Sequence, residues 1–520
     1  MRLSWNTSIK ARLYAVLFAA PVVIPVLACT DLDETPVSQI TPENFFKNEG
    51  EVLSALAGVY AQLRPGLWSY YNLAQITADE NIIPTRGQDW YDNGRWLELD
   101  KQAWTANSPS ALDDINGGWT DAFSGVVRAN ALLENMEGVT IANAASVDAE
   151  IRVLRAFYYY QLMDMFGGVP LVTDTELKTR PKNTRTEIFD FIESELKAVR
   201  GALPLTRPAD QYGRVVRGVA DAILANMYLN AGVFRRETGV SATAYNSCTT
   251  VTIGGVSACQ LAINFADSIL NSGAFQLATN WRSNFTADNN TSKENIFVVN
   301  SLNADGLGIN FLYRALHYNQ LSPTPWNGFS TIADVYNQFD ADDQRRQIFL
   351  VGQQINFDTG QPVTDRAGRP LVFTVSIGNE TAAGEHEGAR IAKWPSDPAH
   401  VNQEHGNDFQ YFRLAEIYLI KAEAQFELGN LVGALTLLNT LRARVFEPDE
   451  PLLTVDRDVI LRERLFELTG EAKRRQDLIR HGKFTMAWSF KPATAAHKIL
   501  FPIPQTQIDA NPQLTQNPGY

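Results

Sequence analysis

Residues 408–444 read DFQYFRLAEIYLIKAEAQFELGNLVGALTLLNTLRAR, and this stretch decides the fold. Apolar residues recur every three or four positions on both sides of Gly429-Asn430, which predicts two helices joined by a tight turn. The large, small, glycine, small, large order of a tetratricopeptide-type hairpin is followed by Tyr418, Ala422, Gly429, Ala434 and Leu438. Because the helix over 414–428 is apolar on two faces, other helices must cover it, and further helix pairs are expected.

Several other stretches have the same helical spacing. In chain order, helices are predicted over 41–64, 148–166, 186–200, 218–231, 261–270 and 457–480. Residues 218–231 repeat the first-helix pattern of the hairpin and find a partner only at 261–270, so the segment between them is interpreted as an insertion within a repeat. The expected fold is mainly α, a scaffold of tetratricopeptide-like helical hairpins.

Three stretches lack helical periodicity. Residues 67–120 are rich in aromatic residues and are expected to form long loops with short helical pieces. Residues 275–405 contain many Asn, Gly, Asp and Pro, with β-like runs at 295–299 and 371–375. A segment this long and irregular is usually functional surface rather than scaffold. The tail, 483–520, holds too much proline for a helix and is expected to lie extended over the body.

Length and charge limit the classes of function. No Gly/Ser-rich or Pro-rich linker divides the 520 residues, which predicts one large body. The formal net charge is −13, and the first 28 residues carry basic side chains but no acid, so the remainder is more acidic still. This balance argues against a nucleic acid as the partner.

Residues 1–28 have the features of a bacterial lipoprotein signal peptide. Lys10 and Arg12 precede a short apolar run over 13–27 that is interrupted by proline and is followed by Ala28-Cys29. If Cys29 is the mature first residue, its acyl chains would anchor the protein to a bilayer, and residues 29–40 would form a tether. The alternative is an ordinary signal peptide with an incidental cysteine.

The two remaining cysteines, Cys248 and Cys259, flank a Thr/Gly-rich segment. Disulfides persist in exported proteins, so a bridge that closes this small loop is expected. Two free thiols are the alternative. The spacing carries no zinc or redox signature.

Short segments spread over nearly the whole mature chain resemble the SusD/RagB family of outer-membrane lipoproteins. Residues that carry the resemblance are CTDLDETP at 29–36, LRAFY at 154–158, FGGVPL at 166–171, FRLAEIY at 412–418, Glu463-Arg464, Glu467-Leu468, Arg474-Arg475, Asp477 to Arg480, LFPIP at 500–504 and NPQLTQNPG at 511–519. Departures are small: Gln476 stands where the family often has an aromatic residue, and Ala472 where it often has glycine.

The resemblance implies a fold and a function. Family members carry four tetratricopeptide-like helix pairs and a loop-rich ligand face, which would divide this chain into an N-terminal part, 41–274, and a C-terminal part, 275–520. In the second part, helical hairpins would occupy 408–482. Such proteins are anchored in the outer membrane, cover a SusC-type TonB-dependent transporter and capture glycans, or in some branches peptides, for import.

The ligand is expected to bind at an aromatic loop. Five of the ten tryptophans lie within 52 residues, from Trp68 to Trp119. Flat rings suit the C–H faces of sugars, while carboxylates, amides and guanidiniums hydrogen-bond the hydroxyls. The run PTRGQDWYDNGRW at 84–96 resembles the glycan-site loop of part of the family, and Tyr318 with two other residues from the irregular segment is expected to form the opposite wall. The predicted ligand-binding residues are Asp79, Arg86, Asp89, Trp90, Asn93, Trp96, Tyr313 and Trp326.

Some of these rings could instead cap the helical body. Trp104 and Trp119 lie in more helix-like surroundings and are assigned to the core, whereas Trp90 and Trp96 are the rings proposed for the ligand.

Catalysis is not favoured by any motif. Close pairs of acids are inevitable among 58 acidic residues, and Glu463, Glu467 and Glu471 lie four apart on a predicted helix. They are better explained, with Arg464 and Arg474, as an ion-pair network that fixes the helix to the tail. The histidines at 386, 400 and 405 fit no compact metal spacing, so no metal or cofactor is expected.

The leading hypothesis is a surface glycan-binding lipoprotein that delivers oligosaccharide to a transporter. Three alternatives remain at this point: an oligopeptide receptor of the same family, a structural adaptor that binds only the transporter, and a glycosidase.

Overall fold

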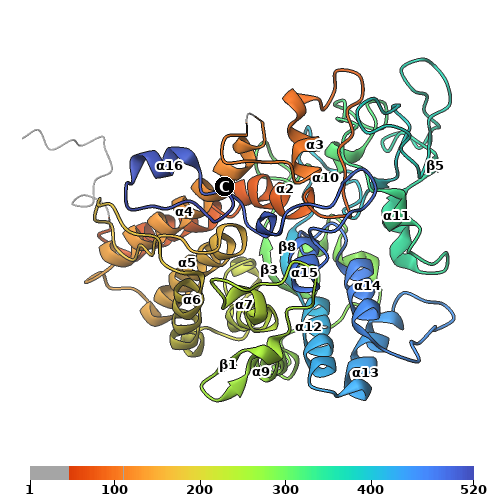
Figure 1. The fold of residues 1–520 in the computed structure, drawn as a ribbon. Helices are drawn as coiled ribbons and strands as arrows, with labels where there is room; N and C mark the ends of the chain where they lie inside the picture. The colour runs from red at the N-terminus through yellow and green to blue at the C-terminus, as the bar shows by residue number, and fades with distance from the viewer. Residues whose placement is uncertain (1–45, 109) are drawn as a thin grey trace, which may run out of the picture. The chain divides into compact units, whose positions relative to one another are not determined.

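Helices that follow one another in the chain pack in the same order. The computed structural model describes residues 46–108 and 110–520, which form one unit. Figure 1 shows the series across the lower half of the molecule, from orange to blue. The contacts run from α4 (Leu112–Asn135) to α5 (Ala144–Phe166) and α6 (Arg185–Val199), then from α7 (Arg217–Leu229) to α9 (Ala258–Leu270), α12 (Leu414–Glu427) and α13 (Leu431–Arg442). The predicted mainly α class is confirmed.

The α12–α13 hairpin forms as the sequence predicts. Gly429 takes a φ of 84°, which turns the chain after α12 without the steric cost a side chain would bring. The Asn430 side chain then accepts a hydrogen bond of 3.0 Å from the Gly433 amide and caps α13. The partnership of α7 with α9 is also confirmed.

Short strands tie the irregular segment to this scaffold. Residues 409–413, at the start of the deciding stretch, form strand β8 (Phe409–Arg413), which pairs antiparallel with β3 (Asn295–Val299). Both strands are almost fully buried, including the polar side chains of Gln410 and Arg413 in β8. The remaining pairs are β1 (Thr252–Ile253) with β2 (Val256–Ser257), β4 (Phe349–Leu350) with β7 (Arg390–Ile391), and β5 (Gly352–Gln353) with β6 (Val372–Phe373).

Two elements differ from the prediction near the C-terminus. The helix expected over 457–480 is two helices, α14 (Arg457–Leu468) and α15 (Arg474–Arg480). The chain breaks between them because Gly470 and Ala472 both have positive φ, 83° and 59°. The tail is not extended throughout, since residues after Pro504 form a short helix, α16 (Gln505–Ala510).

Helix α4 was not predicted and begins inside the stretch expected to be loops. Its glycines obscure the helical signal, but they permit close packing. A Cβ on Gly125 would lie 2.4 Å from the ring of Tyr158 in α5, and one on Gly118 would lie 2.7 Å from Leu73. The other helices are α1 (Glu49–Ala61), α2 (Ser69–Gln75), α3 (Arg95–Asp100), α8 (Ala231–Phe234), α10 (Phe311–Ala315) and α11 (Ala333–Tyr336).

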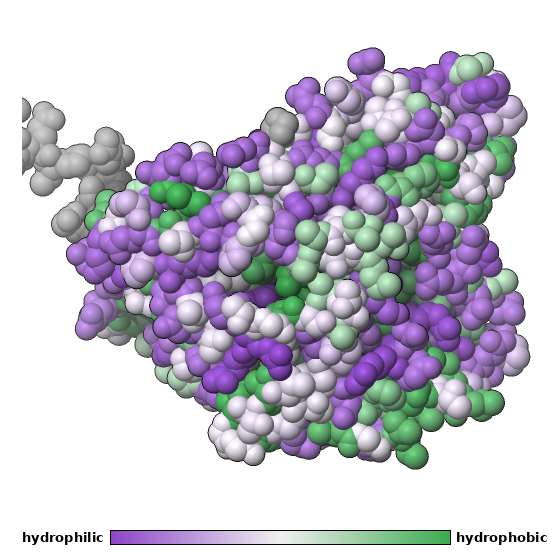
Figure 2. Space-filling view, in the orientation of Figure 1, coloured by the Kyte–Doolittle hydropathy of each residue, from purple (hydrophilic) through white to green (hydrophobic). Residues whose placement is uncertain are grey.

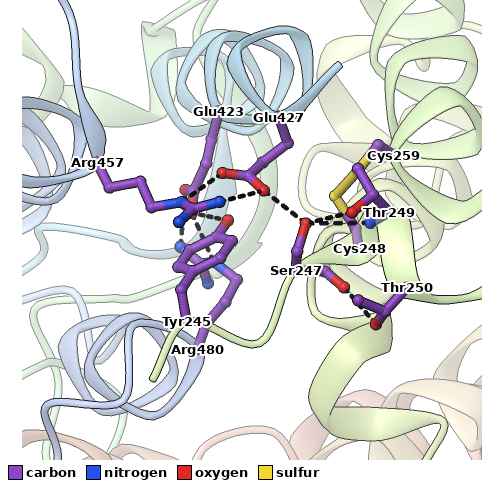
Figure 3. Close-up of a disulfide and its surroundings, with 10 residues drawn as sticks. All are labelled: Tyr245, Ser247, Cys248, Thr249, Thr250, Cys259, Glu423, Glu427, Arg457 and Arg480. Carbon is purple, nitrogen blue, oxygen red and sulfur yellow. Dashed lines mark hydrogen bonds and ion pairs between the residues drawn. A yellow bond between two sulfur atoms is a disulfide. The ribbon is translucent and has the colours of Figure 1, made fainter. Parts of the chain in front are cut away.

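The expected disulfide is present. Cys248 and Cys259 are bonded and close a small loop that contains the β1–β2 hairpin (Figure 3). Next to the bridge, the Ser247 hydroxyl donates a 2.5 Å hydrogen bond to Glu427 of α12, and Arg457 of α14 pairs with the same carboxylate at 2.7 Å. The insertion between α7 and α9 is thereby attached to the C-terminal hairpins.

The predicted ionic network is buried inside the molecule, but with other partners. Glu467 and Glu471 of the α14–α15 region bind Arg413 of β8, with its nitrogens 2.7 and 2.8 Å from their oxygens. The arginines expected to neutralise them pair elsewhere: Arg464 with Asp477 and Arg474 with Asp79.

The surface in Figure 2 is mostly hydrophilic, with hydrophobic residues at the lower edge where α12 turns into α13. Leu428, Leu431 and Val432 are exposed there. Within the described residues, none of the helices combines the length and the apolar character that a membrane span requires. The expected signal peptide, Cys29 and the tether lie outside the described residues.

Candidate ligand-binding surface

The loop expected to bind ligand is held by a buried arginine. Arg86 and Asp89 exchange backbone hydrogen bonds of 2.9 and 3.1 Å around Gly87, forming a tight turn. The Arg86 guanidinium is 1% exposed and donates to the Ser330 hydroxyl at 3.0 Å and the Glu387 carbonyl at 2.8 Å. Burial lowers the pKa of Arg86 to about 10. Arg86 therefore joins three loops and is too deeply buried to donate a hydrogen bond to a ligand at the surface.

Trp90 lies at the end of this turn and is half-buried. Its backbone is left-handed, with a φ of 61°, and its indole N–H donates a 2.5 Å hydrogen bond to the carbonyl of Trp326. The ring lies over Gly328, where an added Cβ would come within 2.3 Å of it. The Trp90 ring is thus fixed by a segment more than 230 residues away in the sequence.

Trp96 lies beneath Trp90 and is only 2% exposed. The two ring centroids are 5.2 Å apart in an edge-to-face arrangement, and the Trp96 N–H donates to Asp92 at 2.6 Å. The guanidinium of Arg95 lies 4.7 Å from the centre of the Trp96 ring. Because both faces and the N–H are occupied, Trp96 supports Trp90 and offers no open face to a ligand.

Three further aromatic side chains are accessible near Trp90. Trp326 is half-buried, with its ring centroid 6.3 Å from that of Trp90, and Tyr91 is 55% exposed. Tyr318 is half-buried and donates its hydroxyl hydrogen to Asp89. We call Trp90, Tyr91, Tyr318 and Trp326 together the aromatic surface.

Charged groups border the aromatic surface on one side. Arg366 lies with its guanidinium 4.3 Å from the Tyr318 ring centre, hydrogen-bonds Glu385, and has a nitrogen 3.5 Å from an Asp89 oxygen. Glu385 also contacts His317, at 2.9 Å. Burial acts to raise the pKa of Glu385, but hydrogen bonds from His317 and Arg366 outweigh it and lower that pKa. Glu385 is therefore held as a carboxylate, the opposite of what a general acid needs.

The structure separates the eight predicted ligand residues. Asp89, Trp90 and Trp326 lie together at the aromatic surface. Tyr313 is fully buried, with its hydroxyl donating to the Asn402 carbonyl at 2.8 Å. Asn93 is exposed, and its carbonyl accepts a 2.7 Å hydrogen bond from Ser110. Asp79 belongs to a different pocket, where it pairs with Arg474.

Two tryptophans of the aromatic stretch belong to the core, and one arginine outside it reaches the aromatic surface. Trp104 and Trp119, assigned to the core, are 0% and 4% exposed, which confirms that assignment. Arg366 was missed by the sequence reasoning. It lies in the irregular segment 275–405, where no periodicity indicates which side chains meet, and only its basic character could have suggested it.

Comparison with known proteins gives two family matches. Residues 270–520 match the family described as "SusD family", and residues 32–229 match "Starch-binding associating with outer membrane". Together these matches take in both halves of the chain.

Individual relatives match over most of their length. "Starch-binding protein SusD" of Bacteroides thetaiotaomicron is 26% identical over 505 residues, which cover 86% of this chain and 85% of the relative. "SusD-like protein P25" of Formosa agariphila is 23% identical, with 94% and 96% covered.

Solved structures share the fold. A "Laminarin binding SusD-like protein" superposes with a TM-score of 0.71 at 22% identity, over 91% of this chain and all of the other. "Surface glycan-binding protein A from Bacteroides thetaiotaomicron in complex with laminarihexaose" gives 0.69 at 21% identity, over 90% of this chain and 99% of the other.

Proposed function

Because this chain belongs to the SusD family, we propose that it is a cell-surface lipoprotein that binds a glycan and delivers it to a SusC-type TonB-dependent transporter. In this proposal the acylated Cys29 anchors the protein in the outer membrane. The protein captures oligosaccharide without cleaving it. The starch-binding relative and the laminarin-binding neighbours support a glycan as the ligand.

The aromatic surface is the observation that carries the proposal. Trp90 and Trp326 expose part of each ring while the Trp90 N–H is held by a hydrogen bond, so little side-chain entropy is lost when a sugar packs on them. Asp89 and Arg366 lie at the border and can accept from and donate to hydroxyl groups.

The predicted ligand residues then divide by role. Asp89, Trp90 and Trp326 contact the sugar, and the exposed Asn93 contributes at the edge of the same loop. Arg86, Trp96 and Tyr313 position these contacts from inside the protein, as their burial requires.

Alanine substitution at Trp90 tests this function. We expect Trp90→Ala to weaken binding of a neutral oligosaccharide such as laminarihexaose or maltoheptaose by roughly 1 to 3 kcal/mol, since a central aromatic contact is lost. Calorimetry on the mature protein gives the affinity, and circular dichroism checks that the fold is retained. Phe426→Ala, which removes a half-buried aromatic side chain from α12, is the matched control.

Three outcomes would replace the proposal. Binding of oligopeptides with no binding of glycans would identify a peptide receptor. Copurification with the transporter but no small ligand in calorimetry would identify a structural adaptor. Release of shorter sugars from a bound glycan would identify a glycosidase.

A further inference from the structure

A second pocket lies away from the aromatic surface and shares none of its residues. Its volume is about 350 Å³, and it is lined by residues of α14 and α15, by Gln338 just after α11 and by the loop that follows Lys483. This is large enough for one sugar ring, at the lower end of the usual range for ligand sites. Its lining mixes one tryptophan with five charged side chains: Asp79, Asp458, Arg462, Arg474, Lys483 and Trp488.

One part of the pocket wall is a fixed ion pair. Two nitrogens of Arg474 lie 2.7 and 2.8 Å from the two oxygens of Asp79, and Arg474 also donates to the Leu461 carbonyl at 3.2 Å. Each Asp79 oxygen keeps a lone pair beyond its bond to Arg474. The carboxylate is therefore oriented before a ligand arrives and can still accept a hydrogen bond from a hydroxyl.

Two charged side chains of α14 lie beside this wall, and only one of them has a partner among the described residues. Lys483 pairs with Asp458 at 2.5 Å and lowers the pKa of Asp458, with smaller contributions from His481 and Arg462. Arg462 is exposed and makes no hydrogen bond or ion pair of its own with any described residue. The pocket thus presents a free guanidinium in a protein whose formal net charge is −13. A guanidinium fork matches the two oxygens of a carboxylate or sulfate.

The aromatic part of the wall is Trp488. It is half-buried, and the ammonium group of Lys491 lies 3.9 Å from its ring centre. Lys491 is in turn fixed by donating to the Met486 carbonyl at 2.8 Å. The exposed side chain of Met486 also lines the pocket. A sugar ring entering here would meet apolar groups on one side and charged groups on the other.

We propose that this pocket is a second glycan subsite, which takes one pyranose ring bearing an anionic group, either a carboxylate or a sulfate ester. Trp488 packs on the C–H face of the ring, Asp79 accepts from its hydroxyls, and Arg462 pairs with the anion. The inference rests on the proposed glycan-binding function and adds an acidic component to the glycan that the protein captures.

A matched series of sugars tests the subsite. The mature protein is titrated with trigalacturonate, with 6-O-sulfated galactotriose and with neutral galactotriose of the same linkage, using calorimetry at low and at physiological salt. We expect at least one anionic form to bind at least tenfold more tightly than the neutral form, with a difference that shrinks at higher salt. If trigalacturonate binds more tightly than the sulfated sugar, the subsite takes a carboxylate, and if the sulfated sugar binds more tightly, it takes a sulfate ester.

Two substitutions locate that preference. Arg462→Gln is expected to reduce the affinity for the anionic sugar to that for the neutral sugar. Trp488→Ala is expected to reduce the affinity for the anionic sugar by tenfold or more. Arg457→Gln is the control, because it removes the same charge from an exposed position on the same helix, where Arg457 pairs with Glu427. It is expected to leave the affinities unchanged.

The subsite and the proposed function can fail separately. If neither anionic sugar binds more tightly than the neutral one, or if Arg462→Gln has no effect while Trp90→Ala abolishes anionic binding, the pocket is not a subsite. In either case the effect of Trp90→Ala on neutral glycans still tests the aromatic surface.

Discussion

Glu80 follows Asp79 in the chain but points into the protein, where it is 1% exposed. Burial raises the pKa of Glu80 from 4.5 to about 8, although the nearby Arg474 acts to lower it. One of its oxygens has no hydrogen-bond partner among the described residues. Between pH 4.5 and 8 the folded protein therefore holds a proton that the unfolded chain has lost, so this residue makes stability fall as pH rises through that window.

The Glu80→Gln variant should remove this dependence. Glutamine is close in shape to the protonated acid and cannot ionise, so the variant should gain stability relative to the natural protein between pH 5.5 and 8.5, by on the order of a few kcal/mol. Its extra amide donor can add a cost that is the same at every pH. Urea unfolding at the two pH values measures the effect. If the free energy of unfolding changed equally between the two pH values in both proteins, Glu80 would have to be ionised in the folded state.

Single residues also show where sequence reasoning stops. Trp90 and Trp96 were given the same role because both lie in one aromatic loop, and nothing in the spacing separates them. The difference comes from long-range packing: Trp68, Phe329 and Trp90 itself lie against Trp96 and bury it, whereas Trp90 stays partly open. Arg86 was predicted to bind ligand because it lies in the aromatic loop and carries a guanidinium. Its partners, the Ser330 hydroxyl and the carbonyls at 384 and 387, depend on long-range contacts that periodicity does not encode.

At the scale of elements, the insertion between α7 and α9 depends on a small covalent loop. Cys248 and Cys259 are 11 residues apart, and the Tyr245 hydroxyl nearby donates to Glu423 of α12 at 2.9 Å (Figure 3). Closing a loop of this size restricts the unfolded chain by about 3 kcal/mol in the chain-entropy view.

Replacing both cysteines with serine should therefore lower the free energy of unfolding by about 2 to 3 kcal/mol. Urea unfolding measures the change. The natural protein under reducing conditions is the control, and its free energy of unfolding should approach that of the variant. Neutral-glycan binding at the aromatic surface should persist, because no residue of that surface contacts the loop. A variant as stable as the natural protein would mean that the hydrogen bonds of Ser247 and Tyr245 suffice to hold the insertion.

Elements with strong periodicity were the predictable ones. Helices α5, α6, α7, α9, α12 and α13 were located within a few residues, because each has one continuous apolar pattern. Helix α4 was missed because glycines that serve its close packing weaken the helical signal. The break between α14 and α15 was missed because a positive φ at Ala472 comes from tertiary structure rather than from any local preference of alanine.

At the scale of the whole molecule, the irregular segment 275–405 is joined to the helical scaffold by buried charges. Arg413 of β8 is 1% exposed and contacts Glu294, which precedes β3, as well as Glu467 and Glu471. Lys393 of the irregular segment hydrogen-bonds the same Glu471. Burial acts to raise the pKa of Glu471, but Arg413 and Lys393 outweigh it, and the pKa is lowered. These ion pairs hold Glu294 and Lys393, both in the irregular segment, against the α14–α15 region.

Removing Arg413 should therefore destabilise the fold as a whole. In Arg413→Met, the buried carboxylates of Glu467 and Glu471 lose their shared partner, and we expect a loss of about 3 to 5 kcal/mol at neutral pH, measured by urea unfolding. Arg369→Met, which removes an exposed arginine paired with Asp365, should stay close to the natural protein.

The pH dependence distinguishes this effect from a simple packing defect. Acids with a lowered folded-state pKa stabilise the protein above their unfolded pKa, here 4.5, and that contribution is lost as pH falls through the folded value. The natural protein should therefore lose stability on acidification below pH 4.5. Arg413→Met should lose less, because its carboxylates are no longer held ionised to the same degree, and the two proteins should converge in stability. A constant gap at every pH would show that Arg413 acts through its packing and not through its charge.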